Sequence, residues 1–431
     1  MNIEKGVKMK GRIRSQKAGC TLGKSVCLLL LIVGLGLLGE DSFAAGYQRV
    51  MSLAERHDRE LQALSIRFHA ARKKHKQSKV FPNNPVLSIQ GGPILFAPKS
   101  QMALSVSLGA QVTLALPVGG RWRRRVLMEQ KNVEKLKSQL EMVRLRVRYE
   151  AYLRLTSLLF SRKHLEVVKE LEDITFKYYR LMRSRARIGA TTTFALQMAQ
   201  LEWLKLKKAR LQKEAELRAK RLQMLQVLQL PSTSKLSFSG SLARTFRSLP
   251  SIKSLVEKAT LRNAKLRWLK KVLVWHRATY LLAQAKGIPD LTMSVSYVLD
   301  QGAHYVQGGL SMPLPFFFKN QSAKTELLSK LQQSKIQYVM ARNRLSLSVS
   351  QAVLRYNTAR SLWRLGKRRL LPVVLAQRST LEKGFEMKAI TSLQLIVAQR
   401  NWLRHNVQQL RAWQRVVEAE LALRMLTGEL L

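Results

Sequence analysis

Histidine and cysteine are the residue types that most often bind metals or act as nucleophiles, and the chain has seven histidines and two cysteines. The only histidines near a ligand-like spacing, His69 and His75, lie six residues apart in a basic segment that we expect to face solvent. The sequence has no G-x-S-x-G nucleophile motif, no P-loop and no dinucleotide-binding fingerprint. We therefore predict that the protein is not an enzyme and that it holds neither a metal nor a cofactor.

The N-terminal segment has the three parts of a secretory signal. Residues 1–24 carry seven Lys or Arg and one Glu, an apolar stretch runs from Val26 to Leu38, and Ser42-Phe43-Ala44 supplies small residues for cleavage. The apolar stretch is shorter than the about 20 residues of a transmembrane helix. We predict a signal peptide over residues 1–44, with an uncleaved anchor as the alternative. Cleavage would remove both cysteines, so the mature chain would contain no disulfide.

The rest of the sequence repeats itself once. Pro117 ends an alternating apolar segment and precedes Ala199-Gln200 by 82 residues, and Pro315 ends another and precedes Ala398-Gln399 by 83. A fixed internal repeat of this length determines the architecture and must be recognised first. We predict a first repeat over 45–230, a polar connector over 231–250 and a second repeat over 251–431. Each repeat is expected to contain a shorter helix (about 47–79 and 251–286), two strands and a long helical hairpin.

The strands are predicted over about 86–96, 102–116, 289–299 and 305–315. From Met102 to Leu116 every second residue is apolar and the residues between are small or polar, which gives a strand one apolar and one polar face. A half-buried sheet in a soluble domain has the same alternation. The small, uncharged polar face and the strand lengths favour a membrane barrel, whose tilted strands need about 9–11 residues. Because lipid does not tolerate open sheet edges, four strands must be completed by further copies of the chain.

Aromatic residues gather at the ends of the alternating segments. In a membrane barrel they would form the girdle at the membrane–water interface. For the three phenylalanines, packing under a loop is the alternative. The candidates are Trp122, Tyr297, Tyr305, Phe316, Phe317 and Phe318.

Long helical hairpins are predicted over about 122–228 and 320–428. Residues 122–183 contain neither proline nor glycine, so they can form a helical rod about 90 Å long. Apolar residues at steps of three and four form a narrow seam on it, which includes Leu136, Leu140, Val143, Val147 and Ala151. The returning helix carries a second seam, at steps of three, four and seven, which includes Leu201, Leu204 and Leu211. Such seams pack against neighbouring helices, either within the hairpin or in another copy of the chain.

The order of helix, strand, strand and long helical hairpin, used twice behind a secretory signal, resembles the TolC-like outer-membrane efflux proteins. Pro-Leu-Pro-Phe-Phe-Phe-Lys-Asn-Gln at residues 313–321 is similar to the sequence that leaves the fourth strand in the branch serving heavy-metal resistance-nodulation-division (RND) pumps. Ile-Pro-Asp-Leu at 288–291 and Gly-Gly-Arg at 119–121 resemble sequences beside the third and second strands of that branch. The resemblance covers nearly all of the chain after the signal.

The resemblance implies a mainly α fold with short β-strands. Three protomers would form a twelve-stranded β-barrel in the outer membrane and an α-helical barrel across the periplasm. It also implies a passive channel of a tripartite efflux system, in which a periplasmic adaptor protein and an inner-membrane RND-type pump deliver metal ions or small molecules. By match, the hairpin tips that contact the adaptor are Ile188, Gly189, Ala190, Met387, Lys388 and Ala389. The family usually has glycine where this chain has Lys388.

The charge balance keeps other functions open. With 76 Lys or Arg against 26 Asp or Glu, the formal net charge is +50, a balance typical of proteins that contact nucleic acid or anionic membranes. A secretory signal argues against nucleic acid, and we hypothesise that the charge suits an acidic or anion-rich exterior. Two alternatives remain: a duct for type I protein secretion, and a secreted basic coiled-coil protein that binds anionic surfaces without forming a pore.

Overall fold

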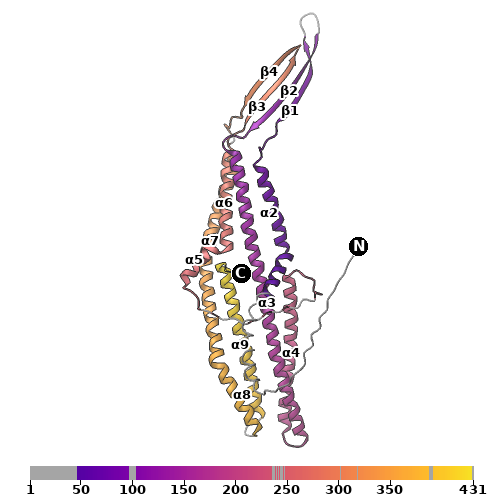
Figure 1. Ribbon diagram of the computed structural model, residues 1–431, viewed down its shortest axis with the longest axis vertical. Coiled ribbons are helices and arrows are strands. Elements are labelled where there is room, and N and C mark those ends of the chain that lie inside the picture. Colours follow the sequence, from indigo (N-terminus) through magenta and orange to yellow (C-terminus); the bar gives the residue numbers. More distant parts are fainter. Residues whose placement is uncertain are drawn as a thin grey trace, which may run out of the picture.

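The computed structural model describes residues 46–96, 103–234, 248–300, 302–317, 319–387 and 392–429, together with 238, 240, 242 and 246. The predicted signal peptide lies outside these residues. The molecule is elongated, with a four-stranded sheet at one end and helices running along the rest of its length (Figure 1). The predicted fold class, mainly α with short strands in two repeats of helix, two strands and helical hairpin, is confirmed. Within the described ranges, no helix is both long and apolar enough to cross a membrane.

The sheet joins the two repeats. Its strands are β1 (Val86–Phe96), β2 (Ala103–Leu116), β3 (Leu291–Asp300) and β4 (Ala303–Ser311), and they pair antiparallel in the order β1-β2-β3-β4. The β2–β3 pair therefore links the first repeat to the second, and β1 and β4 form the edges. β4 ends at Ser311, earlier than the predicted residue 315, because Pro313 and Pro315 lack the N–H group that a ladder needs.

The first hairpin consists of α3 (Arg121–Arg187) and α4 (Thr193–Val227). At 67 residues, α3 is about 100 Å long. Three residues of its predicted apolar seam, Val143, Val147 and Ala151, are at most 5% exposed. The helix is uninterrupted because neither proline nor glycine occurs within it.

The second hairpin is interrupted. It consists of α7 (Gln321–Leu365), a π-helical turn η1 (Gly366–Leu370), α8 (Leu371–Glu386) and α9 (Ser392–Thr427). Pro372, at the second position of α8, cannot donate the hydrogen bond that would continue a regular helix. The side-chain amide of Gln409 on α9 donates to the carbonyl oxygen of Trp363, at 3.0 Å, just before the π-turn.

Each of the shorter predicted helices is two helices. Residues 46–57 are helical and are followed by α2 (Arg59–Ser78), and α5 (Ile252–Arg262) is followed by α6 (Ala264–Ala285). The residues between them, Asp58 and Asn263, have extended backbones, and their side chains accept hydrogen bonds from the backbone N–H groups of Leu61 (2.7 Å) and Leu266 (3.1 Å). Both are N-caps, so the two repeats bend at corresponding points.

The helices pack side by side along the molecule rather than around one central core. Next to the sheet, α2 packs on α3, α3 on α6 and α6 on α7, whereas farther away α3 lies between α4 and α9 (Figure 1). The largest buried cluster lies midway along the molecule, where residues 46–57 and Phe246 of the connector pack onto α3, α7 and α9. Fully buried members include Ala54, Leu155, Phe160 and Val416.

Candidate functional site

The two faces of the sheet differ in chemistry across all four strands. Leu87 lies opposite Val112, and Val112 lies opposite Val295, so these apolar side chains share one face. The other face carries a row of hydroxyl and amide side chains that lie directly opposite one another: Ser88, Gln111, Ser296 and Gln307. Apart from Asp300 at the end of β3, the strands contain no Asp, Glu, Lys or Arg.

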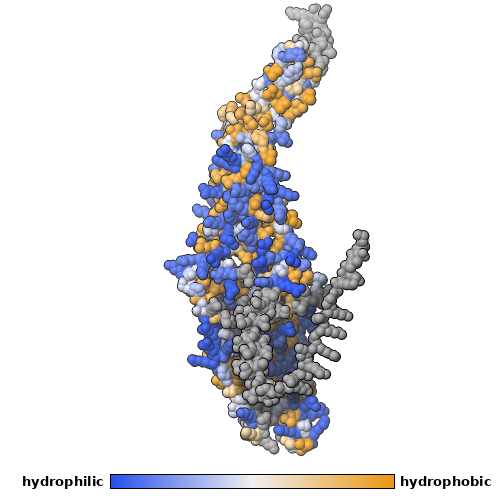
Figure 2. Space-filling model, in the orientation of Figure 1, coloured by the Kyte–Doolittle hydropathy of each residue, from blue (hydrophilic) through white to orange (hydrophobic). Residues whose placement is uncertain are grey.

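The apolar face is uncovered in the single chain. Val295, Val306 and Leu310 are 60%, 76% and 70% exposed, and Figure 2 shows hydrophobic surface on the strands above helices that are largely hydrophilic. A contiguous exposed apolar surface of this kind marks contact with lipid or with another protein.

The candidate interfacial aromatics lie at both ends of the sheet. Tyr297 is near the β3–β4 turn on the apolar face, where its hydroxyl contacts His304 Nδ1, whereas Tyr305 projects from the opposite face beside Gln307. Phe316 and Phe317 lie at the other end, where the chain leaves β4, and are 73% and 96% exposed. Phe318 is outside the described residues.

Trp122 lies at that same end, in the first turn of α3, and is only half-exposed. Its indole N–H donates to the carbonyl oxygen of Ser78 at 2.9 Å, and its ring meets Phe81 edge-on at 6.1 Å. Trp122 therefore also fixes the end of α2 against the start of α3, which its sequence position alone did not reveal.

The first hairpin tip is a tight turn with an exposed apolar corner. α3 ends in a Schellman motif: the N–H of Gly189 donates to the Ala186 carbonyl at 3.2 Å, and the N–H of Ala190 to that of Arg185 at 2.8 Å. Gly189 has φ +70°, which a residue with a side chain adopts only with strain. The turn leaves Ile188 77% exposed at the end of the molecule.

At the second tip, Met387 follows α8 and is 78% exposed. Lys388 and Ala389 lie outside the described residues. The two hairpins end at the same end of the molecule, opposite the sheet (Figure 1). The predicted tip residues that the structure describes therefore lie together at one end.

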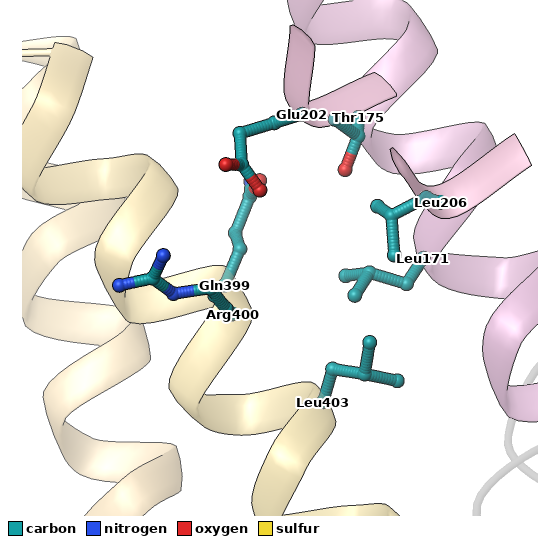
Figure 3. Close-up of a pocket in the computed structure, with 7 residues that line it drawn as sticks. All are labelled: Leu171, Thr175, Glu202, Leu206, Gln399, Arg400 and Leu403. Carbon is teal, nitrogen blue, oxygen red and sulfur yellow. The ribbon is translucent and has the colours of Figure 1, made fainter. Parts of the chain in front are cut away.

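A small cavity lies between the two hairpins just above the tips. Its volume of about 30 Å³ is enough for one water molecule, and it lies between Thr175 of α3, Glu202 of α4 and Gln399 of α9. Figure 3 shows Glu202 extending toward the side of α9, and Arg400 and three leucines complete the wall. Glu202 is 8% exposed and pairs with Lys205 of its own helix at 2.8 Å. The contact between the hairpins is therefore partly polar at this level.

Titratable groups in the described ranges do not form a metal site, since no cluster of three or more His, Cys, Asp or Glu occurs there. His164 on α3 is isolated and 5% exposed, and its Nε2 has no hydrogen-bond partner. Burial, with a smaller contribution from the Lys213 ammonium, lowers the pKa of His164 to about 4. The side chain is therefore neutral at physiological pH.

Comparison with known proteins gives a fold but not a close relative. No protein-family model matches the sequence, and no curated protein matches it. Among solved structures, CusC, studied for its folding and transmembrane channel formation, is 16% identical with a TM-score of 0.69, over 90% of this chain and 94% of CusC. The outer membrane protein VceC of Vibrio cholerae is 13% identical with a TM-score of 0.71, over 89% of this chain and 96% of VceC. The open-state outer membrane channel MtrE of Neisseria gonorrhoeae is 14% identical with a TM-score of 0.69, over 89% of this chain and 88% of MtrE. At these identities the likeness establishes a TolC-like fold.

Proposed function

We propose that the protein is an outer-membrane channel of a tripartite efflux system, through which substrates leave passively. The observation that carries this proposal is the sheet, whose apolar face is continuous across β1–β4 and whose opposite face is small, polar and almost uncharged. Lipid on one side and water on the other would satisfy both faces. The similar structures are of channels and outer-membrane proteins, which supports a conduit rather than an enzyme and an outer-membrane location.

The channel would be a homotrimer. β1 and β4 each have one neighbour within the described sheet, and unpaired strand edges are not tolerated in hydrocarbon. Pairing β4 of one copy with β1 of the next, three times, gives a closed barrel of twelve strands. The helical part supports the same assembly, because Leu201, Leu204 and Leu211 of the predicted seam on α4 are 45–59% exposed in the single chain.

The partners at the other end would be a periplasmic adaptor protein and, through it, an inner-membrane RND-type pump. The exposed tips support this proposal, with Ile188, Gly189 and Ala190 in the first tip and Met387 in the second. Lys388 and Ala389 complete the proposed contact set. An adaptor that packs on apolar corners would bury Ile188 and Met387, which a free tip leaves in water.

The substrate would be metal ions. This finer proposal rests on the sequence at residues 313–321, which resembles the branch that serves heavy-metal pumps. Coexpression with a pump and adaptor of that branch should restore metal resistance to a cell that lacks its own channel. Restored export of a secreted protein or of drugs, without metal resistance, would favour the alternative ducts.

Purification in detergent followed by planar-bilayer recording tests the main proposal. We expect a heat-modifiable trimer from the outer-membrane fraction that forms stable ion-conducting pores. A soluble monomer that binds DNA or lipopolysaccharide with steep salt dependence, and that gives no conductance, would instead identify a basic coiled-coil protein without a pore.

A further inference from the structure

Exposed cations surround the foot of the sheet, which is the end where the strands meet the helices. They come from the end of α2, the start of α3, the end of α6 and the segment before α7, so they occur wherever a helix meets the strands. The exposed members are Lys73, Lys74, Lys76, Lys79, Arg123, Arg125, Lys286 and Lys319. The surface around the foot of the sheet is therefore strongly positive.

The start of α3 breaks the usual rule for helix termini. Positive side chains are unfavourable beside the positive end of a helix dipole, yet residues 121–125 read Arg-Trp-Arg-Arg-Arg. Gly120, the N-cap, provides no capping side chain, and the first turn has no acidic residue. Arg121 is compensated by Asp290 at 2.7 Å, and Arg124 donates to the Leu281 carbonyl at 2.8 Å.

Arg123 and Arg125 have no carboxylate partner among the described residues. Uncompensated positive charges at the start of a helix are unfavourable for folding. We expect such an arrangement where a ligand supplies the negative charge that the chain lacks.

A cavity of about 390 Å³ opens at this point, between the ends of α2 and α6 and the start of α3. Four cations line it: Lys74, Arg121, Arg125 and Lys286. Of these, Lys74 and Arg121 are paired with carboxylates, whereas Arg125 and Lys286 are not paired with any carboxylate in the part of the chain described. The cavity therefore presents two cations to a ligand.

The same cavity also contains hydrogen-bond acceptors that lack donors. Glu129, which is 2% exposed, receives Lys74 at 2.8 Å on Oε1, but its Oε2 is buried without a partner. Asp290 receives Arg121 on Oδ2, and its Oδ1 is likewise buried and unpartnered. A buried acceptor without a donor destabilises a protein by about 1–3 kcal/mol. A ligand that fits both features must carry an anionic group and hydrogen-bond donors close together.

The position of the cavity identifies the class of ligand. Its lining residues lie where the ends of α2 and α6 and the start of α3 meet the strands, so the sheet extends from one side of it and the helices from the other (Figure 1). The exposed Phe316 and Phe317 follow the end of β4, at this same end of the sheet. If the sheet spans the hydrocarbon, as the proposed function requires, the cavity lies at the depth of the headgroups. We propose that it binds a phospholipid headgroup, with the phosphate at Arg125 and Lys286 and a headgroup hydroxyl or ammonium donating to Glu129 or Asp290.

Native mass spectrometry of the detergent-solubilised protein, titrated with single lipids, tests this proposal. Phosphatidylglycerol has a net negative charge and hydroxyl donors, so we expect it to be retained most strongly. Phosphatidylethanolamine, which keeps a donor but is neutral overall, should follow, and phosphatidylcholine, which has no donor, should bind least. Replacing both unpaired cations (Arg125→Gln with Lys286→Gln) should weaken phosphatidylglycerol binding about fivefold for each cation removed.

The matched control is Arg180→Gln with Lys208→Gln, which removes the same two charges from exposed positions near the hairpin tips. It should retain phosphatidylglycerol as the unaltered protein does. Equal retention by the cavity variant, or no preference among the three lipids, would overturn the proposal. Displacement of the lipid by millimolar inorganic phosphate would also overturn it, because the site would then recognise phosphate alone.

Bilayer conductance separates this inference from the proposed function. A protein that conducts ions but has no lipid preference would refute the headgroup site only. A protein that retains phosphatidylglycerol but conducts no ions would refute the channel and leave the site.

Discussion

Lysine substitutions at two adjacent positions of β2 should differ sharply in their effects. Val112 lies on the apolar face between Leu87 and Val295, and Gln111 lies on the polar face between Ser88 and Ser296. If the apolar face contacts lipid, Val112→Lys inserts a charge into hydrocarbon, which is unfavourable by about 2–4 kcal/mol near the bilayer midplane. In a trimer the substitution occurs three times, so the assembly should lose about 6–12 kcal/mol.

Gln111→Lys should change the stability little, because its side chain would lie in a water-filled lumen. It should instead shift the ion selectivity toward anions, since three ammonium groups would surround the pore. The two variants have the same charge and nearly the same position along the chain, so each is the control for the other.

Folding into phospholipid vesicles, followed by the change in gel mobility on heating, measures the stability. The reversal potential across a planar bilayer under a salt gradient measures the selectivity. We expect Val112→Lys to fold poorly and Gln111→Lys to fold normally with a shifted reversal potential. Equal folding of both variants, or the reverse order, would refute the assignment of the faces.

Four further substitutions test the structure at single positions. Gly120→Ala should destabilise the protein by about 1–2 kcal/mol, because Gly120 has a positive φ but a Cβ there would meet no neighbouring atom. Gly119→Ala should destabilise it by about 1–3 kcal/mol more, because a Cβ at Gly119 would also lie 2.7 Å from Cδ1 of Ile288. Urea titration of the two variants in detergent compares their stabilities. Because the pKa of His164 is low in the folded protein, the unfolded chain binds a proton at this side chain more readily. The stability should therefore be constant above about pH 6.5 and fall by at most about 3 kcal/mol as the pH drops toward 4. If His164→Gln leaves this pH profile unchanged, His164 does not cause it. Asn263→Ala removes both the cap to Leu266 and the bond to the Leu426 carbonyl, and should lower the urea midpoint by the equivalent of about 1–3 kcal/mol; an unchanged midpoint would show that the bend needs no cap.

Much of the fold could be predicted because the sequence repeats its period-two and helical patterns. The alternation in 102–116 established the two faces of β2, and the lack of proline and glycine after residue 121 gave α3 its length. The bends at Asp58 and Asn263 were missed, because a single polar residue within a helical pattern is recognised as a cap only when its backbone is seen to be extended. The π-turn was also missed, although Gly366 and Pro372 were visible signals for it.

The candidate sites were predictable to different degrees. The first tip followed from a glycine between two helical runs, because a Schellman turn requires a positive φ. The cavity at the foot of the sheet could not be predicted, since Lys74, Arg125 and the pair Lys286 and Asp290 come from three segments that lie far apart in the sequence. The hydrogen bond from Trp122 to Ser78 could not be predicted for the same reason, because it joins two segments that are far apart in the sequence.

Cysteine cross-linking between the two sheet edges tests most directly the claim that several chains close one barrel. Ser88 on β1 and Gln307 on β4 lie on the polar face at opposite edges of the sheet. With the two natural cysteines, Cys20 and Cys27, replaced by serine, Ser88→Cys is combined in turn with a cysteine at Tyr305, Gln307 or Ser311. We predict that oxidation in the membrane gives covalent dimers and trimers for at least one pair, and none for the single-cysteine variants. Cross-links confined to monomers, at every pair, would contradict the account.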